Sequence, residues 1–157
     1  MIEPISPDDE PAVLALNTIH AAQLSLLDET GLKRLLDAAY VARRIGDLEA
    51  FMIAFDQDAD YASPNFLWFR ERYPRFAYVD RIAVAAAARG RGHARRLYEH
   101  LFERARRDGH TVVTCEVNSD PPNPASDAFH QALGFRVVGE ASIYGGDRTV
   151  RYYERRL

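Results

Sequence analysis

The sequence is poor in cysteine and lysine, with only Cys115 and Lys33 among its 157 residues. A lone cysteine excludes an internal disulfide and a zinc site built on cysteines. Arginine supplies nearly all of the positive charge, and the 20 basic residues are outnumbered by 23 acidic ones, which gives a net charge of −3. General nucleic-acid binding requires a basic excess that this chain lacks. We therefore expect no nucleic-acid partner.

Long apolar segments are also missing. No apolar run approaches the roughly 20 residues that a membrane-spanning helix needs, and the first ten residues lack the basic and apolar regions of a signal peptide. The histidines show no metal-ligand spacing, so no metal is expected. The length suits one domain over residues 1–157. We expect a single cytoplasmic domain with no membrane partner.

Residues 76–109 carry the strongest structural signal in the chain. Apolar and β-branched residues dominate positions 76–84, which is typical of a strand. A glycine-rich segment occupies positions 89–94, and a helical pattern follows it. One face of this helix is apolar at three- and four-residue spacing: Ala94, Leu97, Tyr98, Leu101, Phe102 and Ala105. Gly109 is suited to end the helix. The pattern predicts a strand, a glycine-rich turn and a helix.

The predicted turn has a chemical consequence. The N-terminus of a helix leaves backbone N–H groups without partners and carries partial positive charge, which favours a bound anion such as a phosphate. Gly90 and Gly92 let the backbone approach a ligand, and Arg89, Arg91 and Arg95 add positive charge. The alternative is that the two glycines only shape a tight connection between strand and helix.

The remaining elements follow from hydrophobic periodicity, capping residues and turn residues. Strands are expected at residues 2–5, 40–45, 48–55, 111–117, 135–144 and 148–155, and helices at 6–27, 30–39 and 123–134. Ser6 and Thr30 are the expected caps of the first two helices. The order predicts an α/β (α+β) fold, with a mixed sheet of six to seven strands, flanking helices and a central parallel crossover.

Residues 56–75 are harder to assign, because aromatic and charged residues alternate there without a long period. Ser63 can cap a short helix, so we expect a loop and a short helix lying over the sheet. Five aromatic residues fall in this segment: Tyr61, Phe66, Trp68, Phe69 and Tyr73. They either pack against the core or form a lid over an acceptor pocket.

A second motif lies at residues 123–135, which read Asn-Pro-Ala-Ser-Asp-Ala-Phe-His-Gln-Ala-Leu-Gly-Phe. The first motif consists of the strand end Ile-Ala-Val at 82–84 and the turn Arg-Gly-Arg-Gly-His-Ala at 89–94. Together, with one strand between them, they resemble the GNAT superfamily of acetyl-CoA-dependent N-acetyltransferases. The second motif is similar to the penultimate helix of that family, and the order of elements agrees over essentially the whole chain.

The resemblance implies that acetyl-CoA is the cofactor. The pyrophosphate would lie on the glycine-rich turn, formed by Arg89, Gly90, Arg91, Gly92, His93 and Ala94. The pantetheine arm would pair with the backbone of the preceding strand at Ile82, Ala83 and Val84. The helix of the second motif would flank the thiol end through Asn123 and Ser126.

Glu116 and His130 are the main candidates for proton transfer. Glu116 resembles the strand glutamate that some ribosomal-protein N-acetyltransferases use as a base. The alternative is that Glu116 is only a polar residue at a strand end, bonded to backbone. Asp80 and Tyr78 are the other candidates for the base. His130 stands where the family often has the tyrosine that protonates the leaving thiolate, so it is the candidate acid. Cys115 lies between valines in a strand and is expected to be buried.

These features predict direct transfer of an acetyl group from acetyl-CoA to an amine, without a covalent enzyme intermediate. The acceptor is either a small-molecule amine or a peptide amine, and the sequence does not distinguish them. The alternative function is a catalytically inactive module that binds CoA in a regulatory role. A homodimer that forms through an exposed strand is also compatible with the sequence.

Overall fold

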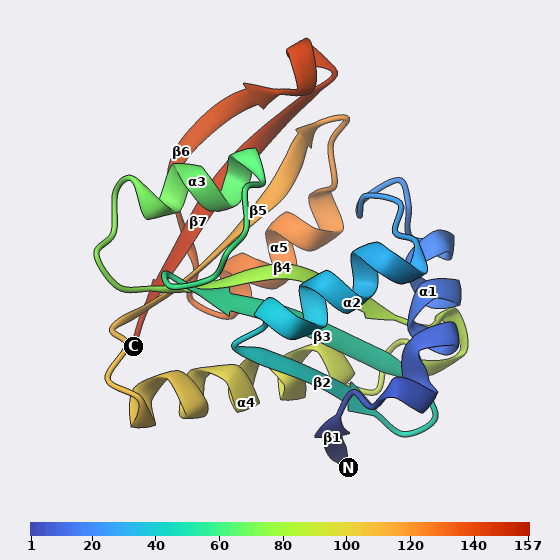
Figure 1. The fold of residues 1–157 in the computed structure, drawn as a ribbon. Coiled ribbons are helices and arrows are strands. Elements are labelled where there is room, and N and C mark those ends of the chain that lie inside the picture. The colour runs from blue at the N-terminus through green and yellow to red at the C-terminus, as the bar shows by residue number, and fades with distance from the viewer.

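A seven-stranded mixed sheet runs through the computed structural model, which describes residues 1–157 (Figure 1). In chain order the strands are β1 (Ile2–Pro4), β2 (Val41–Ile45), β3 (Ala50–Asp56), β4 (Ala77–Val84), β5 (Val112–Asp120), β6 (Arg136–Ile143) and β7 (Arg148–Arg156). Their order across the sheet is β1-β2-β3-β4-β5-β7-β6, and only the β4–β5 pair is parallel. The expected mixed sheet is confirmed. β1 and β6 form its edges, and a homodimer through either edge stays a prediction.

Five helices cover the two faces of the sheet (Figure 1). They are α1 (Glu10–Ile19), α2 (Glu29–Ala38), α3 (Pro64–Arg70), α4 (His93–Arg107) and α5 (Pro124–Ala132). Apolar side chains of α1, α2 and α3 share one core with one face of the sheet. Those of α4 share a second core with the other face, together with residues of α5 and its C-terminal end. No helix combines the length and apolar character that crossing a bilayer requires.

Side-chain caps explain where three helices begin. The side chain of Ser63 accepts a hydrogen bond from the N–H of Phe66 at the start of α3, and Asn123 accepts one from Ser126 at the start of α5. The Ser63 cap was expected, and the Asn123 cap agrees with the expected start of a helix at residue 123. The cap of α2 is Asp28, whose Oδ1 lies 2.7 Å from the nitrogen of Gly31. The expectation of Thr30 as this cap is wrong, because a free carboxylate two positions earlier takes the role.

The expected extension of the first helix to residue 27 is also wrong. A 3₁₀ turn at Pro7–Asp9 precedes α1, and α1 ends at Ile19, whose side chain is exposed. The chain then runs through turns to residue 28. Leu24 and Leu27 still pack against the first core from this irregular connection. Apolar spacing alone therefore could not distinguish a longer helix from a loop that packs its leucines.

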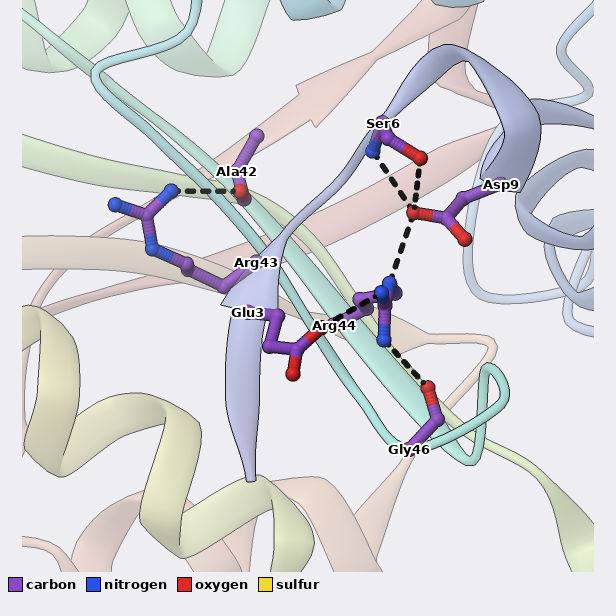
Figure 2. Close-up of polar contacts among 7 residues, drawn as sticks. All are labelled: Glu3, Ser6, Asp9, Ala42, Arg43, Arg44 and Gly46. Atoms are coloured by element: carbon purple, nitrogen blue, oxygen red, sulfur yellow. Dashed lines mark hydrogen bonds and ion pairs between the residues drawn. The ribbon is translucent and has the colours of Figure 1, made fainter.

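A cluster around Arg44 fastens the N-terminal segment to the sheet (Figure 2). Arg44 of β2 donates hydrogen bonds to the carboxylates of Glu3 and Asp9, both at 2.8 Å, and to the carbonyl oxygen of Gly46. Asp9 also accepts from the N–H and hydroxyl of Ser6, and the backbone hydrogen bond from Ser6 lowers the pKa of Asp9. Because α1 follows directly, this cluster fixes where α1 starts.

The parallel crossover from β4 through α4 to β5 is confirmed, and it creates an opening in the sheet. β4 and β5 pair only through Ala77 with Val113 and Tyr78 with Thr114. Beyond these pairs the two strands diverge, so residues 79–84 of β4 have no strand neighbour on the β5 side. Backbone N–H and C=O groups on this edge are left for another partner.

Candidate active site

A cavity of about 610 Å³ occupies the opening between β4 and β5. Its walls come from β4, β5, α5, the start of α4, the start of α3, the connection between α1 and α2, and the β6–β7 hairpin. Nine of the predicted site residues line it: Ile82, Ala83, Val84, Arg89, Ala94, Glu116, Asn123, Ser126 and His130. The structure therefore brings both motifs and the candidate base to one place.

The glycine-rich turn leads into α4 beside this cavity. Gly90 has φ +80° and Gly92, the N-cap of α4, has φ +76°, and L-residues rarely adopt either conformation. A Cβ built at either position meets no atom within 4 Å, so open space lies over both glycines. No side chain caps α4, which leaves its first N–H groups to an anion. These features fit the pyrophosphate of CoA.

Two side chains of the turn point elsewhere. Arg91 Nη1 lies 3.4 Å from Oε1 of Glu49, and His93 Nε2 lies 2.9 Å from Oε2 of the same carboxylate. Arg96 donates to Nδ1 of His93, so Nε2 carries the ring proton and donates to Glu49. The positive charge of Arg91, which was expected to face the anion, therefore pairs with Glu49. The side chain of His93 is buried. Nothing in the sequence around position 49 indicates this partner.

Glu116 of β5 lines the cavity and is half-buried. Burial raises the pKa of its carboxyl group to about 7, and the nearby charge of Asp80 acts in the same direction. The hydroxyl of Tyr78 donates a hydrogen bond to Glu116 and opposes the shift, because it stabilises the carboxylate. A carboxyl group with this pKa is present in both forms near neutral pH, which suits a proton acceptor.

Asp80 is engaged in a different interaction. Its carboxylate accepts from the hydroxyl of Tyr61 at 2.6 Å and from Nε of Arg81 at 2.8 Å, and both members of the ion pair are buried. Arg81 also donates to Oδ1 of Asn17 and to the carbonyl oxygen of Ser25. This network joins β4 to α1 and to the connection after it. Asp80 therefore serves as a structural ion partner, and Tyr78 as a donor to Glu116.

His130 lines the cavity with both ring nitrogens engaged. Nδ1 lies 2.7 Å from the carbonyl oxygen of Ser126, which can only accept, so Nδ1 carries a proton. Nε2 lies 2.7 Å from the hydroxyl of Tyr98, which therefore donates to it in the neutral ring. Burial lowers the pKa of His130, which favours the neutral form. A proton on Nε2 is thus present only in the imidazolium form.

The aromatic segment before β4 divides into two parts. Phe66 and Phe69 of α3 are fully buried in the first core, and Trp68 stacks on Tyr152 with ring centroids 4.2 Å apart. None of these four residues lines the cavity, whereas Tyr61 does, together with the polar residues that begin α3. The interpretation of α3 as a lid is wrong, because its aromatic face packs on the sheet.

This packing gives a prediction for stability. A Cβ added at Gly139 of β6 would clash with the indole ring of Trp68, so Gly139→Ala should lower the free energy of unfolding by about 1–3 kcal/mol. Trp68→Ala should cost about 3 kcal/mol. In the Trp68→Ala background, Gly139→Ala should cost little more, since the clash is gone. Urea unfolding of the three variants measures this, and additive losses would contradict the assigned contact.

Sequence reasoning missed a group of cavity residues. The connection between α1 and α2 contributes His20, Gln23, Leu24 and Ser25, and the β6–β7 hairpin contributes Ile143, Tyr144 and Arg148. Tyr98 was expected only as part of an apolar helix face. Irregular connections carry no periodic signal, so their approach to the cavity depends on the tertiary structure.

Comparison with known proteins agrees with this geometry. The model of the acetyltransferase (GNAT) family matches residues 24–135. An L-2,4-diaminobutyric acid acetyltransferase of Wolinella succinogenes is 36% identical over 82 residues. This alignment covers 52% of the chain and 47% of the relative, so the match spans about half the length of that curated protein.

Solved structures show the same fold over the full chain. The ribosomal-protein-S18-alanine N-acetyltransferase of Escherichia coli superposes with a TM-score of 0.72 at 18% identity, covering 99% of this chain and 92% of that one. Ard1 of Thermoplasma volcanium gives a TM-score of 0.79 at 15% identity, covering 100% and 97%. At these identities the likeness concerns the fold.

Proposed function

The chain belongs to the acetyltransferase (GNAT) family, and on this premise we propose that it transfers the acetyl group of acetyl-CoA directly to an amine. The observation that carries the proposal is the position of Glu116. Its carboxyl group, with a pKa of about 7, lines the cavity where β4 and β5 diverge, and the uncapped start of α4 lies beside the same cavity.

The proposed donor site is made largely of backbone. The N–H groups at the start of α4 would bind the pyrophosphate, with Arg89 adding charge at the cavity wall. The free edge of β4 at Ile82, Ala83 and Val84 would pair with the amide groups of the pantetheine arm. Asn123 and Ser126 would flank its end, since both line the cavity. Acetyl-CoA supplies an activated acyl group with a thiolate leaving group.

Glu116 is the proposed base for the acceptor. A lysine-like amine with a pKa of about 10.4 is almost entirely protonated at neutral pH and cannot attack a carbonyl carbon. The carboxylate of Glu116 would take a proton from the amine, directly or through one water, and Tyr78 would hold the carboxylate in place through its hydrogen bond.

His130 is the proposed source of the proton for the leaving thiolate. In its imidazolium form, Nε2 would donate to the hydroxyl oxygen of Tyr98, and the Tyr98 proton would pass to the thiolate. The net change is one proton moved from His130 to sulfur, with Tyr98 restored. Both residues line the cavity, which supports this relay.

Acceptors named for the relatives include a diamino acid and a ribosomal-protein alanine. We propose a small-molecule or peptide amine here. The test is a panel of such amines incubated with acetyl-CoA, with thiol release and product mass as readouts. Amine-dependent thiol release is the expected result. CoA binding by calorimetry without acetylation of any amine would favour the inactive CoA-binding module instead.

A further inference from the structure

Arg148 is a cation without a partner at one end of the cavity. It is the first residue of β7, directly after the turn of the β6–β7 hairpin, and this hairpin extends beyond the end of β5 (Figure 1). Its side chain lines the cavity and is half-buried, and it makes no hydrogen bond or ion pair within the protein. Arg81, which lines the same cavity, is by contrast fully engaged by Asp80, Asn17 and Ser25.

A guanidinium group in such a position favours an anionic ligand. Arginine stays charged at all accessible pH values, and its planar fork of N–H donors matches the two oxygens of a carboxylate. Partial burial strengthens the interaction, because water competes less for the donors. Arg89, the other cavity arginine without a partner, lies next to the glycine-rich turn and is accounted for by the pyrophosphate.

The sheet register places Arg148 and Glu116 on one face. Glu116 of β5 is directly opposite Tyr152 of β7, and Arg148 is four residues before Tyr152 on the same strand. Residues at even spacing share a face, and Val150 and Tyr152 are both buried in the first core. Four residues correspond to about 13 Å along a strand. Both residues line the cavity, so an acceptor bound there can meet both of them.

We propose that Arg148 binds a carboxylate of the acceptor, so that the acceptor is an amino-acid-like molecule with a reactive amine at Glu116 and a carboxylate at Arg148. The inference rests on the proposed function and narrows it to one class of amine. A peptide N-terminus lacks a free carboxylate next to its amine. The Arg148 guanidinium therefore favours the free amino acid over the protein substrate.

Binding of two matched probes to the CoA-bound protein tests this without turnover. 2,4-Diaminobutyrate and 1,3-diaminopropane share both amines and the carbon chain between them, and differ only in the carboxylate. Calorimetry should give about 10- to 100-fold tighter binding of the diamino acid to the wild type, as expected for a charged hydrogen-bonded pair. Arg148→Met, which keeps length but removes charge, should abolish this preference, and Arg148→Lys should restore part of it.

Arg136 provides the matched control. It lies on β6 of the same hairpin, is exposed and does not line the cavity, so Arg136→Met should keep the wild-type preference. Equal affinities of the wild type for the two probes would overturn the inference, as would an unchanged preference in Arg148→Met. Failure of the proposed function would give a different result. The protein would then prefer the probe with the carboxylate but acetylate no amine.

Discussion

Gly92→Asp is expected to weaken CoA binding by at least about 100-fold, because each charge-assisted hydrogen bond lost costs about 1.5–3 kcal/mol. Gly92 is the N-cap of α4 with φ +76°, and the space over it is open. An aspartate there places a negative charge where the pyrophosphate is proposed to bind, and its side chain can cap the N–H groups that the anion needs.

Calorimetric titration with CoA measures the loss, and a matched variant separates charge at the site from backbone strain. Gly109 has φ +84° and ends the same helix at its other terminus, so Gly109→Asp introduces the same residue into the same type of conformation. We expect this control to lose stability but to bind CoA as the wild type does. If both variants bind CoA equally well, the anion does not lie at the start of α4.

The pH dependence of kcat should depend on Glu116. The folded protein raises the pKa of this group to about 7, so the carboxylate needed as a base appears only as the pH rises through that value. kcat should therefore increase with pH on the acidic side. Glu116→Gln should remove this increase and lower kcat by about 10²–10⁴-fold, the usual contribution of a positioned base. The measurement is kcat against pH with a confirmed amine.

Tyr78→Phe tests the same assignment by changing the pKa of Glu116 without removing its carboxyl group. The Tyr78 hydroxyl stabilises the Glu116 carboxylate, so its removal should raise the pKa of Glu116 further. In the His130→Phe background, where only the ionisation of Glu116 shapes the profile, the acidic limb should then move upward by about one to two pH units, since a hydrogen bond to a charged group is worth about 1.5–3 kcal/mol. A limb that stays in place in Tyr78→Phe and in Glu116→Gln would assign the base to another residue.

The same profile also reports on His130, because catalysis requires its imidazolium form together with the Glu116 carboxylate. Burial lowers the pKa of His130, so it lies below the value of about 7 for Glu116, and kcat should rise with pH up to the His130 pKa and fall above about 7. His130→Phe should leave a profile that rises through about 7 and then stays level, with a reduced plateau and unchanged CoA affinity. Tyr98→Phe should have the same effect, because the relay passes through its hydroxyl. Wild-type kcat in both variants would exclude the relay.

Much of the fold could be predicted because several signals are local. The period of α4, the Ser63 and Asn123 caps and the turn glycines each depend on residues within a few positions of one another. The same holds for the anion site, since a glycine-rich turn before a helix specifies its own chemistry. Glu116 could be selected through its resemblance to a strand glutamate of the family, and the crossover places its strand beside β4.

The rest of the site depends on contacts between distant segments. Glu49 meets Arg91 and His93 across more than 40 positions, and Arg81 meets Asn17 across 64. The ring orientation of His130 depends on Tyr98, which the periodic pattern identified only as an apolar position. Arg148 is one arginine among many in the sequence. Its place in the cavity and its lack of a partner distinguish it from the others, and both appear only in the folded chain.

The short pairing of β4 with β5 has a consequence for how the domain holds together. Apart from two residue pairs between β4 and β5, strands β1 to β4 pair only with one another, and so do β5 to β7. A ligand that lies along the free edge of β4 and contacts β5 or α5 adds contacts between these two groups of strands. The stability of the domain should then increase with the concentration of this ligand, because a molecule that binds only the folded state stabilises it by mass action.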